Sequence, residues 1–307
     1  MTQTHEKILV FGKDGQVGRD LGAFSLEYSD KIWVFAGRAD VDLSDCVALE
    51  NYLNDVHPDA IINAAAYTAV DKAESEPDVA MAVNAQAPGV MACYAAAHQI
   101  PFIHISTDYV FNGQKEGGYR EEDSKDPLGV YGRSKSDGED AVISAGGHFV
   151  ILRTSWVYAV HGHNFVHTML RLGQERDALK IVADQIGAPT WSRDVAAAIL
   201  RILPQIAEDQ SKSGVYHLCA DGQTSWHGFA SLIFEQARQY GLKTPRHVEA
   251  ISSSEYPTPA KRPSNSRLNC SKSEHVFGVR LPLWSESAKT CLSHILSPHS
   301  QKKVLHS

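Results

Sequence analysis

The chain has 307 residues, 43% of them hydrophobic and 21% charged, with a formal net charge of −7. This length allows one large domain or two fused domains, and the acidic balance disfavours nucleic acid polymers and anionic membranes as partners. No apolar run approaches the roughly 20 residues of a membrane span, and the five cysteines show no Cys-x-x-Cys spacing. These features predict a soluble cytoplasmic protein with reduced thiols.

The first predicted element is an apolar strand at residues 7–11, followed by a glycine-rich turn and a helix that starts near Gln16. Glycines at G-x-x-G-x-x-G spacing let the backbone turn tightly and approach a pyrophosphate, and the helix N-terminus presents free N–H groups to it. The turn therefore predicts a dinucleotide site made by Gly12, Asp14, Gly15, Gln16, Val17 and Gly18.

The second predicted strand, at residues 32–36, is followed by Arg38. In this architecture the residues after the second strand meet the adenosine ribose, where a carboxylate favours a 2′-hydroxyl and an arginine favours a 2′-phosphate. Arg38 therefore predicts NADPH as the cofactor, with NADH as a weaker alternative, although a solvated surface arginine is the competing interpretation. Asp42 and Leu43 follow where the adenine is expected to lie.

A third strand is predicted at residues 59–63, and the small residues after it allow close approach of the backbone to the cofactor. An Ala-rich helical region follows at about 71–98, with a break at Pro77. We assign to the cofactor site the strand end and one polar residue on the apolar face of that region, namely Asn63, Ala64, Ala65, Ala66, Tyr67 and Asn84.

The fourth predicted strand, at residues 101–105, leads to Thr107 and Asp108 at its carboxyl end. Further on, Tyr131 and Lys135 lie four apart on one face of a predicted helix. An ammonium beside a phenol lowers the pKa of the phenol, which makes a proton donor for a ketone. Such a pair also arises by chance, since 11 tyrosines give about half a Tyr-x-x-x-Lys in an average chain. Its position after a strand end and a dinucleotide loop favours function.

A fifth strand is predicted at residues 148–152, and strands alternating with helices at this spacing predict an α/β fold of the Rossmann type, a doubly wound parallel sheet. Beyond it the pattern changes, which predicts a smaller, discontinuous C-terminal substrate domain. The predicted division is a cofactor domain at 1–155 with returning segments at about 184–220, a substrate domain at about 156–183 and 221–297, and a tail at 298–307.

The segment at residues 257–268 is irregular and gathers Lys261, Arg262 and Arg267 in an otherwise acidic chain. Clustered cations of this kind suit a small anion such as a diphosphate, and a merely solvated loop is the alternative.

The ordered set of motifs resembles the extended short-chain dehydrogenase/reductases and, within them, the dTDP-4-dehydrorhamnose reductase family. The resemblance runs from Gly12 to about Leu292, nearly the whole chain. It is carried by residues 12–18, 63–71, 106–111, 153–158, 184–190 and 262–268.

The resemblance implies that Tyr131 is the general acid, that Lys135 binds the nicotinamide ribose and lowers the pKa of Tyr131, and that Thr107 bonds the substrate carbonyl. It places Asp108 beside this catalytic group, and it implies a sugar-nucleotide site along Thr107, Asp108, Trp156, Asn164 and Arg267. The implied reaction is hydride transfer from NADPH to the C4 ketone of dTDP-4-dehydro-L-rhamnose, which gives dTDP-L-rhamnose. The implied assembly is a monomer or a homodimer.

No metal site is predicted. His161, His163 and His167 are close in sequence but lack a fourth ligand nearby. Some relatives hold a bridging metal in a dimer through acidic residues after a Pro-Thr turn, where this chain offers only Asp194, so a metal stays an open question.

Two alternatives remain. A non-catalytic NADP-binding subunit, similar to the regulatory beta subunit of methionine adenosyltransferase, keeps the same Tyr-Lys pair. Another nucleotide-sugar reductase, an epimerase or a dehydratase shares the fold, but a dehydratase needs a second carboxylate where Tyr109 follows Asp108.

Overall fold

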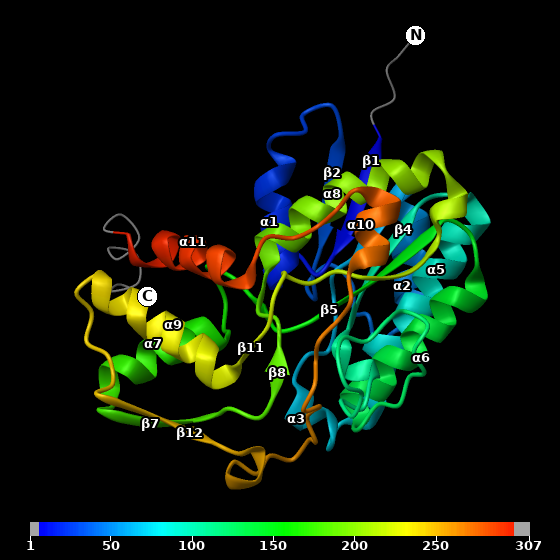
Figure 1. Cartoon of the computed structure of the whole chain (residues 1–307). Helices are drawn as coiled ribbons and strands as arrows, with labels where there is room; N and C mark the ends of the chain where they lie inside the picture. Colours follow the sequence, from blue (N-terminus) through cyan, green and yellow to red (C-terminus); the bar gives the residue numbers. More distant parts are fainter. Residues whose placement is uncertain (1–5, 298–307) are drawn as a thin grey trace.

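The computed structural model describes residues 6–297 (Figure 1). The predicted tail at 298–307 lies outside the described residues, as do the first five.

The centre of the fold is a parallel sheet with the strand order β10-β5-β4-β3-β1-β2. The chain places β2 on one side of β1 and β3 on the other, so the direction of winding reverses between β1 and β3. The predicted doubly wound sheet of the Rossmann type is confirmed. Its strands are β1 (Lys7–Phe11), β2 (Ile32–Ala36), β3 (Ala60–Asn63), β4 (Phe102–Thr107), β5 (Phe149–Thr154) and β10 (Gly214–His217).

Helices cover both faces of this sheet, which is why its inner strands are buried and mostly apolar, with polar residues gathered toward their carboxyl ends. One face carries α1 (Gln16–Ser25), α8 (Ser192–Glu208) and α10 (Ser271–Phe277). The other face carries α2 (Cys46–Val56), α5 (Ala87–His98) and α6 (Val130–Ala145).

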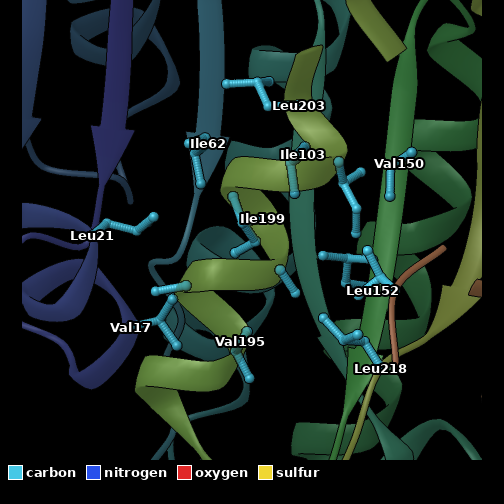
Figure 2. Packing of buried hydrophobic residues seen from close by; sticks show 14 of the residues in the cluster. Val17, Leu21, Ile62, Ile103, Val150, Leu152, Val195, Ile199, Leu203 and Leu218 are labelled. Atoms are coloured by element: carbon cyan, nitrogen blue, oxygen red, sulfur yellow. The ribbon is translucent and has the colours of Figure 1, made fainter. Parts of the chain in front are cut away.

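Figure 2 shows how α8 packs on the sheet: Val195, Ile199 and Leu203 of the helix lie against Ile62 of β3 and Ile103 of β4. All of these side chains are 4% exposed or less. Burying a side chain of this size stabilises the fold by about 1.5–3 kcal/mol relative to leaving it in water. This core fixes the strand ends from which the site is built.

A second cluster of buried residues lies beside the sheet, in the lower left part of Figure 1. It is formed by elements from the segments predicted for the substrate domain, although the domain boundaries themselves stay a prediction. These elements are α7 (Phe165–Glu175), α9 (Trp226–Gln239), α11 (Trp284–Leu296), β7 (Ala178–Val182) and β12 (His247–Ile251). Short strands join the two parts: β6 (Val157–Tyr158), β8 (Ile186–Gly187), β9 (Thr190–Trp191) and β11 (Thr224–Ser225).

The Ala-rich region differs from the single broken helix that the sequence predicts. It forms α3 (Val70–Ala73), α4 (Pro77–Met81), a π-helical turn (Ala82–Gln86) and then α5. A π-helical turn is rare and often marks a functional position, and this one contains Asn84.

Candidate active site

The glycine-rich turn after β1 is held against the end of β3 so closely that side chains would not fit. Gly12 has φ +90°, and a Cβ atom there would lie 2.7 Å from the carbonyl carbon and oxygen of Ala64. A Cβ atom on Gly18 would lie 2.1 Å from the carbonyl oxygen of Gly12. Both glycines are therefore required by the approach of the backbone segments.

The N-terminus of α1 lacks a side-chain cap within the described chain. Gly15 is the N-cap residue, no side chain accepts from the first turn, and that turn contains no acidic residue. Its N–H groups and the positive end of the helix dipole are left for an anion. Asp14 is exposed beside them, whereas the side chain of Val17 belongs to the core. The turn therefore fits a dinucleotide phosphate.

Gln16 points toward the second part of the molecule. Its amide Nε2 lies 3.3 Å from the carbonyl oxygen of Val157, and its Oε1 atom is buried without a hydrogen-bond partner in the described chain.

A second cation, which the sequence reasoning missed, lies beside the turn after β2. Arg38 is exposed and has no ion-pair partner among residues 6–297. Lys13, from the glycine turn, forms an ion pair with Asp40, which also accepts a hydrogen bond from Gly37 N at 2.8 Å. The Lys13 ammonium lowers the pKa of Asp40 by hydrogen bonding. The pairing with Lys13 offsets the charge of the Asp40 carboxylate, which would otherwise repel a 2′-phosphate at this turn.

Asp42 and Leu43 are predicted to lie at the adenine. In the structure both side chains make contacts within the protein. The Asp42 carboxylate accepts hydrogen bonds from the Ser44 backbone N at 2.8 Å and from the Ser44 hydroxyl at 2.7 Å. Leu43 is partly buried against the core that α2 and α5 share.

Asn84 is fully buried and uses its whole amide within the protein. Its carbonyl oxygen accepts from Tyr67 N at 2.8 Å, and its Nδ2 donates to Tyr67 O at 3.1 Å and to Ser134 Oγ at 3.0 Å. Asn84 therefore ties the loop after β3, residues 64–67, to α6. In this structure its link to the predicted cofactor site runs through the backbone of Tyr67.

The predicted catalytic residues meet at the carboxyl ends of the central strands. Thr107 is the last residue of β4, Asp108 follows it, and α6 places Tyr131 and Lys135 one turn apart. The Thr107 hydroxyl donates to Asp108 Oδ1 at 3.1 Å. The Thr107 side chain also forms a hydrogen bond with the Tyr131 phenol, and this bond acts to lower the pKa of Tyr131. The carboxyl ends of parallel strands beside a switch point are where ligands bind in such sheets.

The predicted lowering of the Tyr131 pKa is wrong for this structure. Burial raises the pKa of the Tyr131 phenol to about 12, and the hydrogen bond to Thr107 offsets only part of the effect. The Lys135 amine is bonded elsewhere, since it lies 2.7 Å from the carbonyl oxygen of Ile105 and 3.1 Å from Nε2 of His104. Burial also lowers the pKa of Lys135 to about 8. Desolvation of the phenol therefore outweighs the ammonium, which bonds on the β4 side.

Asp108 is a buried carboxylate with one oxygen unpaired. Oδ1 accepts a hydrogen bond from Thr107, and the Ser266 side chain lies near enough to lower the pKa of the carboxyl in part, but no described residue meets hydrogen-bond geometry at Oδ2. Burial raises the pKa of Asp108 to about 6. An unpaired buried carboxylate oxygen is costly for the fold, and such atoms are commonly found at functional sites.

Arg267 faces a cavity of about 310 Å³ beside the strand ends. Its guanidinium donates to Asn265 Oδ1 at 2.8 Å and to Gln223 Oε1 at 3.2 Å, both neutral partners. No carboxylate in the described chain neutralises it, so its charge stays available to an anion. The cavity is lined by Gly118, Ala188, Cys219, Gly222, Gln223, Arg267, Leu268 and Asn269.

The other substrate candidates have structural contacts of their own. Trp156 has φ +50°, uncommon for a non-glycine residue, and its ring stacks on Trp226 with centroids 3.6 Å apart. Asn164 caps α7 by accepting from His167 N at 3.3 Å, and its amide donates to Ala159 O at 3.0 Å. A substrate role for these two residues stays a prediction.

Among residues 6–297, no group of three or more His, Cys, Asp or Glu side chains is arranged to hold a metal ion. His161 lies 3.7 Å from the Asp20 carboxylate, and His167 contacts the Val160 carbonyl at 3.1 Å.

The part of the chain that the structure describes also contains no helix with the length and hydropathy of a bilayer crossing.

Comparisons with known proteins agree with this architecture. The family model described as the RmlD substrate binding domain matches residues 6–297. A dTDP-4-dehydrorhamnose reductase of Sinorhizobium fredii is 45% identical over 287 residues, covering 92% of this chain and 95% of its own.

Two solved structures share the fold at significant sequence identity. The dTDP-4-dehydrorhamnose reductase of Clostridium acetobutylicum has a TM-score of 0.87 at 34% identity, covering 94% of this chain and 99% of its own. The enzyme of Bacillus anthracis, solved in complex with NADP, has a TM-score of 0.85 at 32% identity, covering 95% of this chain and 100% of its own. The resemblance expected from the sequence motifs is confirmed, and the chain belongs to the dTDP-4-dehydrorhamnose reductase family.

Proposed function

We propose that this protein uses NADPH to reduce the C4 ketone of dTDP-4-dehydro-L-rhamnose to dTDP-L-rhamnose. Relatives at 40–45% identity carry the name of this reductase, and a solved relative binds NADP. The observation that carries the proposal is the meeting of Thr107, Tyr131 and Lys135 at the strand ends, beside an uncapped helix N-terminus.

The proposed roles follow from the chemistry of each group. NADPH, when bound, supplies the hydride that forms the new C–H bond at C4. The Thr107 hydroxyl holds the ketone oxygen, and the Tyr131 O–H transfers its proton to that oxygen as the carbonyl electrons move onto it. A phenol with a raised pKa stays protonated at neutral pH, as a donor must. Lys135, in its ammonium form, stabilises the phenolate that the transfer leaves behind.

The proposed binding roles use the cations described above. Arg38 would pair with the 2′-phosphate of NADPH, supported by Lys13, and α1 would receive the pyrophosphate. Arg267 would pair with the diphosphate of the sugar nucleotide, in the cavity that it lines. Asp108 would accept from a sugar hydroxyl through its unpaired Oδ2 atom.

The experiment that tests the function is NADPH oxidation measured with dTDP-, UDP- and GDP-linked 4-ketosugars. The proposal expects turnover with the dTDP sugar well above turnover with the others. Absence of turnover with every ketosugar, together with co-purification of a synthetase, would favour the regulatory-subunit alternative. Turnover with retained, tightly bound NAD would favour an epimerase.

We further propose that the protein acts in the cytoplasm, which the five free cysteines support. Whether it is a monomer or a homodimer stays a prediction.

A further inference from the structure

Two of the five cysteines lie in contact beside the cavity that Arg267 faces. The Sγ atoms of Cys219 and Cys270 are 3.5 Å apart, although the two residues are 51 positions apart in the sequence. Cys219 follows β10, is buried and lines the cavity, whereas Cys270 lies directly before α10 and is partly exposed. The other three cysteines lie on separate helices, namely Cys46 on α2, Cys93 on α5 and Cys291 on α11.

The contact makes the two thiols chemically different. With Cys219 as the donor, the hydrogen bond between the sulfurs lowers the pKa of Cys270 and raises the pKa of Cys219, which burial raises further. Burial and the carboxylates of Glu121 and Asp221 act to raise the pKa of Cys270, but the hydrogen bond outweighs them. The thiolate is the reactive form of a cysteine. Cys270 is therefore the sulfur that reacts first, with a protonated thiol beside it.

The Cys219 side of the contact is fixed to the body of the fold. The backbone N of Leu218 donates to the carbonyl oxygen of Arg153 in β5 at 2.8 Å. On the other side of the cysteine, the backbone N of Ala220 donates to Oγ1 of Thr190 in β9 at 3.1 Å. These bonds hold Cys219 between two strands, so it cannot easily follow a neighbour that moves.

The other sulfur belongs to the stretch of chain that carries Arg267. The backbone N of Tyr119 donates to Arg267 O at 2.8 Å, and the backbone N of Asn269 donates to Tyr119 O at 2.7 Å. Asn265 accepts from the Arg267 guanidinium at 2.8 Å and donates to two carbonyl oxygens of the loop 112–119 at 2.7 Å. A displacement of this stretch therefore changes the position of the guanidinium and its bonds to the loop together.

We propose that Cys219 and Cys270 form a reversible disulfide when the protein meets hydrogen peroxide, and that this bond weakens binding of a nucleoside diphosphate in the Arg267 cavity. Sulfurs 3.5 Å apart must approach to about 2.0 Å to form the bond. Because the Cys219 side is fixed, the approach displaces the stretch that carries Arg267 along the cavity wall. The effect on binding rests on the proposed function, which assigns this cavity to the diphosphate.

The oxidation takes place in two balanced steps. The Cys270 thiolate attacks one oxygen of the peroxide and the O–O bond breaks, which leaves a sulfenic acid on Cys270 and a hydroxide that takes up the proton lost from the thiol. The Cys219 sulfur then attacks the Cys270 sulfur, the S–O bond breaks and the S–S bond forms, and the hydroxyl group leaves with the Cys219 proton as water. Two thiols are thereby oxidised while one peroxide is reduced to two waters.

The reduced pair is the resting state in a compartment that keeps thiols reduced. Disulfides in such a compartment are usually transient and redox-sensing. Two equivalents of a small thiol reverse the bond by exchange, which returns both cysteines and leaves the small thiol as its own disulfide. The pair therefore makes binding at the cavity sensitive to oxidants without a permanent change of the protein.

The first test maps the disulfide in the full chain. The protein is treated with hydrogen peroxide, its free thiols are alkylated, and its peptides are analysed by mass spectrometry. We expect a Cys219–Cys270 linked peptide pair that has lost two hydrogen atoms and that dithiothreitol separates. Cys219→Ser and Cys270→Ser should each abolish it, whereas Cys93→Ser, which changes an exposed cysteine, should not. Absence of the linked pair at a peroxide concentration that modifies Cys93 would overturn the inference, and this measurement on the wild-type protein stands even if a variant fails to fold.

The second test measures dTDP binding by calorimetry in the reduced and the disulfide forms. The Kd is expected to rise by about tenfold or more in the disulfide form, the equivalent of one charge-assisted hydrogen bond. Cys270→Ser given the same peroxide treatment is the control, and its Kd should stay unchanged. An unchanged Kd in the disulfide form of the wild-type protein would overturn the coupling to the cavity.

The third test is independent of any ligand. Hydrogen exchange at the backbone amides of Tyr119 and Asn269 should be faster in the disulfide form, because their mutual bonds are stretched, and equal exchange in both forms would contradict the displacement. If the reduced protein fails to bind dTDP, the assignment of the cavity in the proposed function is wrong. The disulfide map and the hydrogen exchange then still decide whether the pair forms and whether it moves the Arg267 stretch.

Discussion

Arg262 and Asp71 lie 191 positions apart in the sequence and form a doubly bonded ion pair. The guanidinium Nη1 lies 3.1 Å from Oδ1 of Asp71, and Nη2 lies 2.8 Å from Oδ2. The pair joins the irregular segment 257–268 to the start of α3. Arg262 is one of the three cations that the sequence suggested for a diphosphate. Because its charge is already paired with Asp71, Arg267 is the better candidate.

The pair should stabilise the protein in a pH-dependent way. Arg262 lowers the pKa of Asp71, so the contribution is complete above the unfolded-state pKa of about 4 and is lost as pH falls through the lower folded-state value. Asp71→Asn is expected to lower the free energy of unfolding by about 0.2–1 kcal/mol at pH 7, because the pair is partly exposed. Urea unfolding at pH 7 and near pH 4 measures this. An effect of equal size at every pH would show that the charge is irrelevant.

Asp108 should show the opposite behaviour. Burial raises its pKa to about 6, so the folded protein binds this proton more tightly than the unfolded chain. The carboxylate therefore destabilises the fold progressively as pH rises from about 4 to 6, and fully above that range. Asp108→Asn is expected to be more stable than wild type at pH 7, by up to about 3 kcal/mol, and close to it below pH about 4. Asp71→Asn is the matched control with the opposite sign.

A gain of stability in Asp108→Asn accompanied by weaker binding of the sugar nucleotide would identify Asp108 as a residue kept for function at a cost to the fold. A loss of stability at pH 7 would mean that hydrogen bonds to the carboxylate, such as that from Thr107, outweigh the cost of burying its charge.

Much of the fold was predictable because local patterns decide it. The short apolar runs at residues 7–11 and 32–36 are typical of strands and form β1 and β2, and the glycine spacing after the first run follows from close backbone packing. The same glycines predicted where a dinucleotide phosphate would fit, since Gly12 and Gly18 have no room for a side chain.

The rest depends on contacts that no local pattern contains. The π-helical turn at Ala82–Gln86 brings the backbone carbonyl oxygen of Asn84 against α6, where a Cβ atom on Gly138 would lie 2.1 Å from that oxygen. The raised pKa of Tyr131 depends on how completely the phenol is desolvated and on Lys135 bonding Ile105 instead. These outcomes require the positions of β4 and α6 relative to each other.

The account of the sugar-nucleotide site predicts a binding defect for Arg267→Ala. The diphosphate lies away from C4, so its contacts are equally strong in the ground and transition states. Removing them is expected to raise the substrate KM by about one to two decades with kcat nearly unchanged. Arg267→Lys should recover only part, because an ammonium lacks the two-pronged geometry of a guanidinium. Steady-state kinetics at saturating NADPH measures both.

Arg171→Ala is the control for this variant, since Arg171 is exposed on α7 and pairs with Glu175 there. An unchanged KM in Arg267→Ala would remove Arg267 from the site. A fall confined to kcat would place it next to the reacting atoms.

The choice between NADPH and NADH should depend on Arg38. Arg38→Asp is expected to reduce the NADPH/NADH ratio of kcat/KM by about tenfold or more, because a charge-assisted bond is lost and a repulsive carboxylate is gained. Arg176→Asp makes the same change of charge at an exposed position outside the proposed site. If the two variants give the same ratio, Arg38 is a surface residue without a role in cofactor choice.

The central claim is that Tyr131 donates the proton in reduction of the C4 ketone. Its most direct test is the kcat for NADPH oxidation with dTDP-4-dehydro-L-rhamnose, measured for wild type, Tyr131→Phe and Tyr109→Phe. Tyr109 is the matched control, since its ring lies edge-on to that of Tyr131 with centroids 5.5 Å apart, and the substitution removes the same hydroxyl. The account predicts that Tyr131→Phe lowers kcat by about 10²-fold or more with NADPH binding unchanged, while Tyr109→Phe stays near wild type. A wild-type kcat in Tyr131→Phe would contradict it and assign the proton to another group.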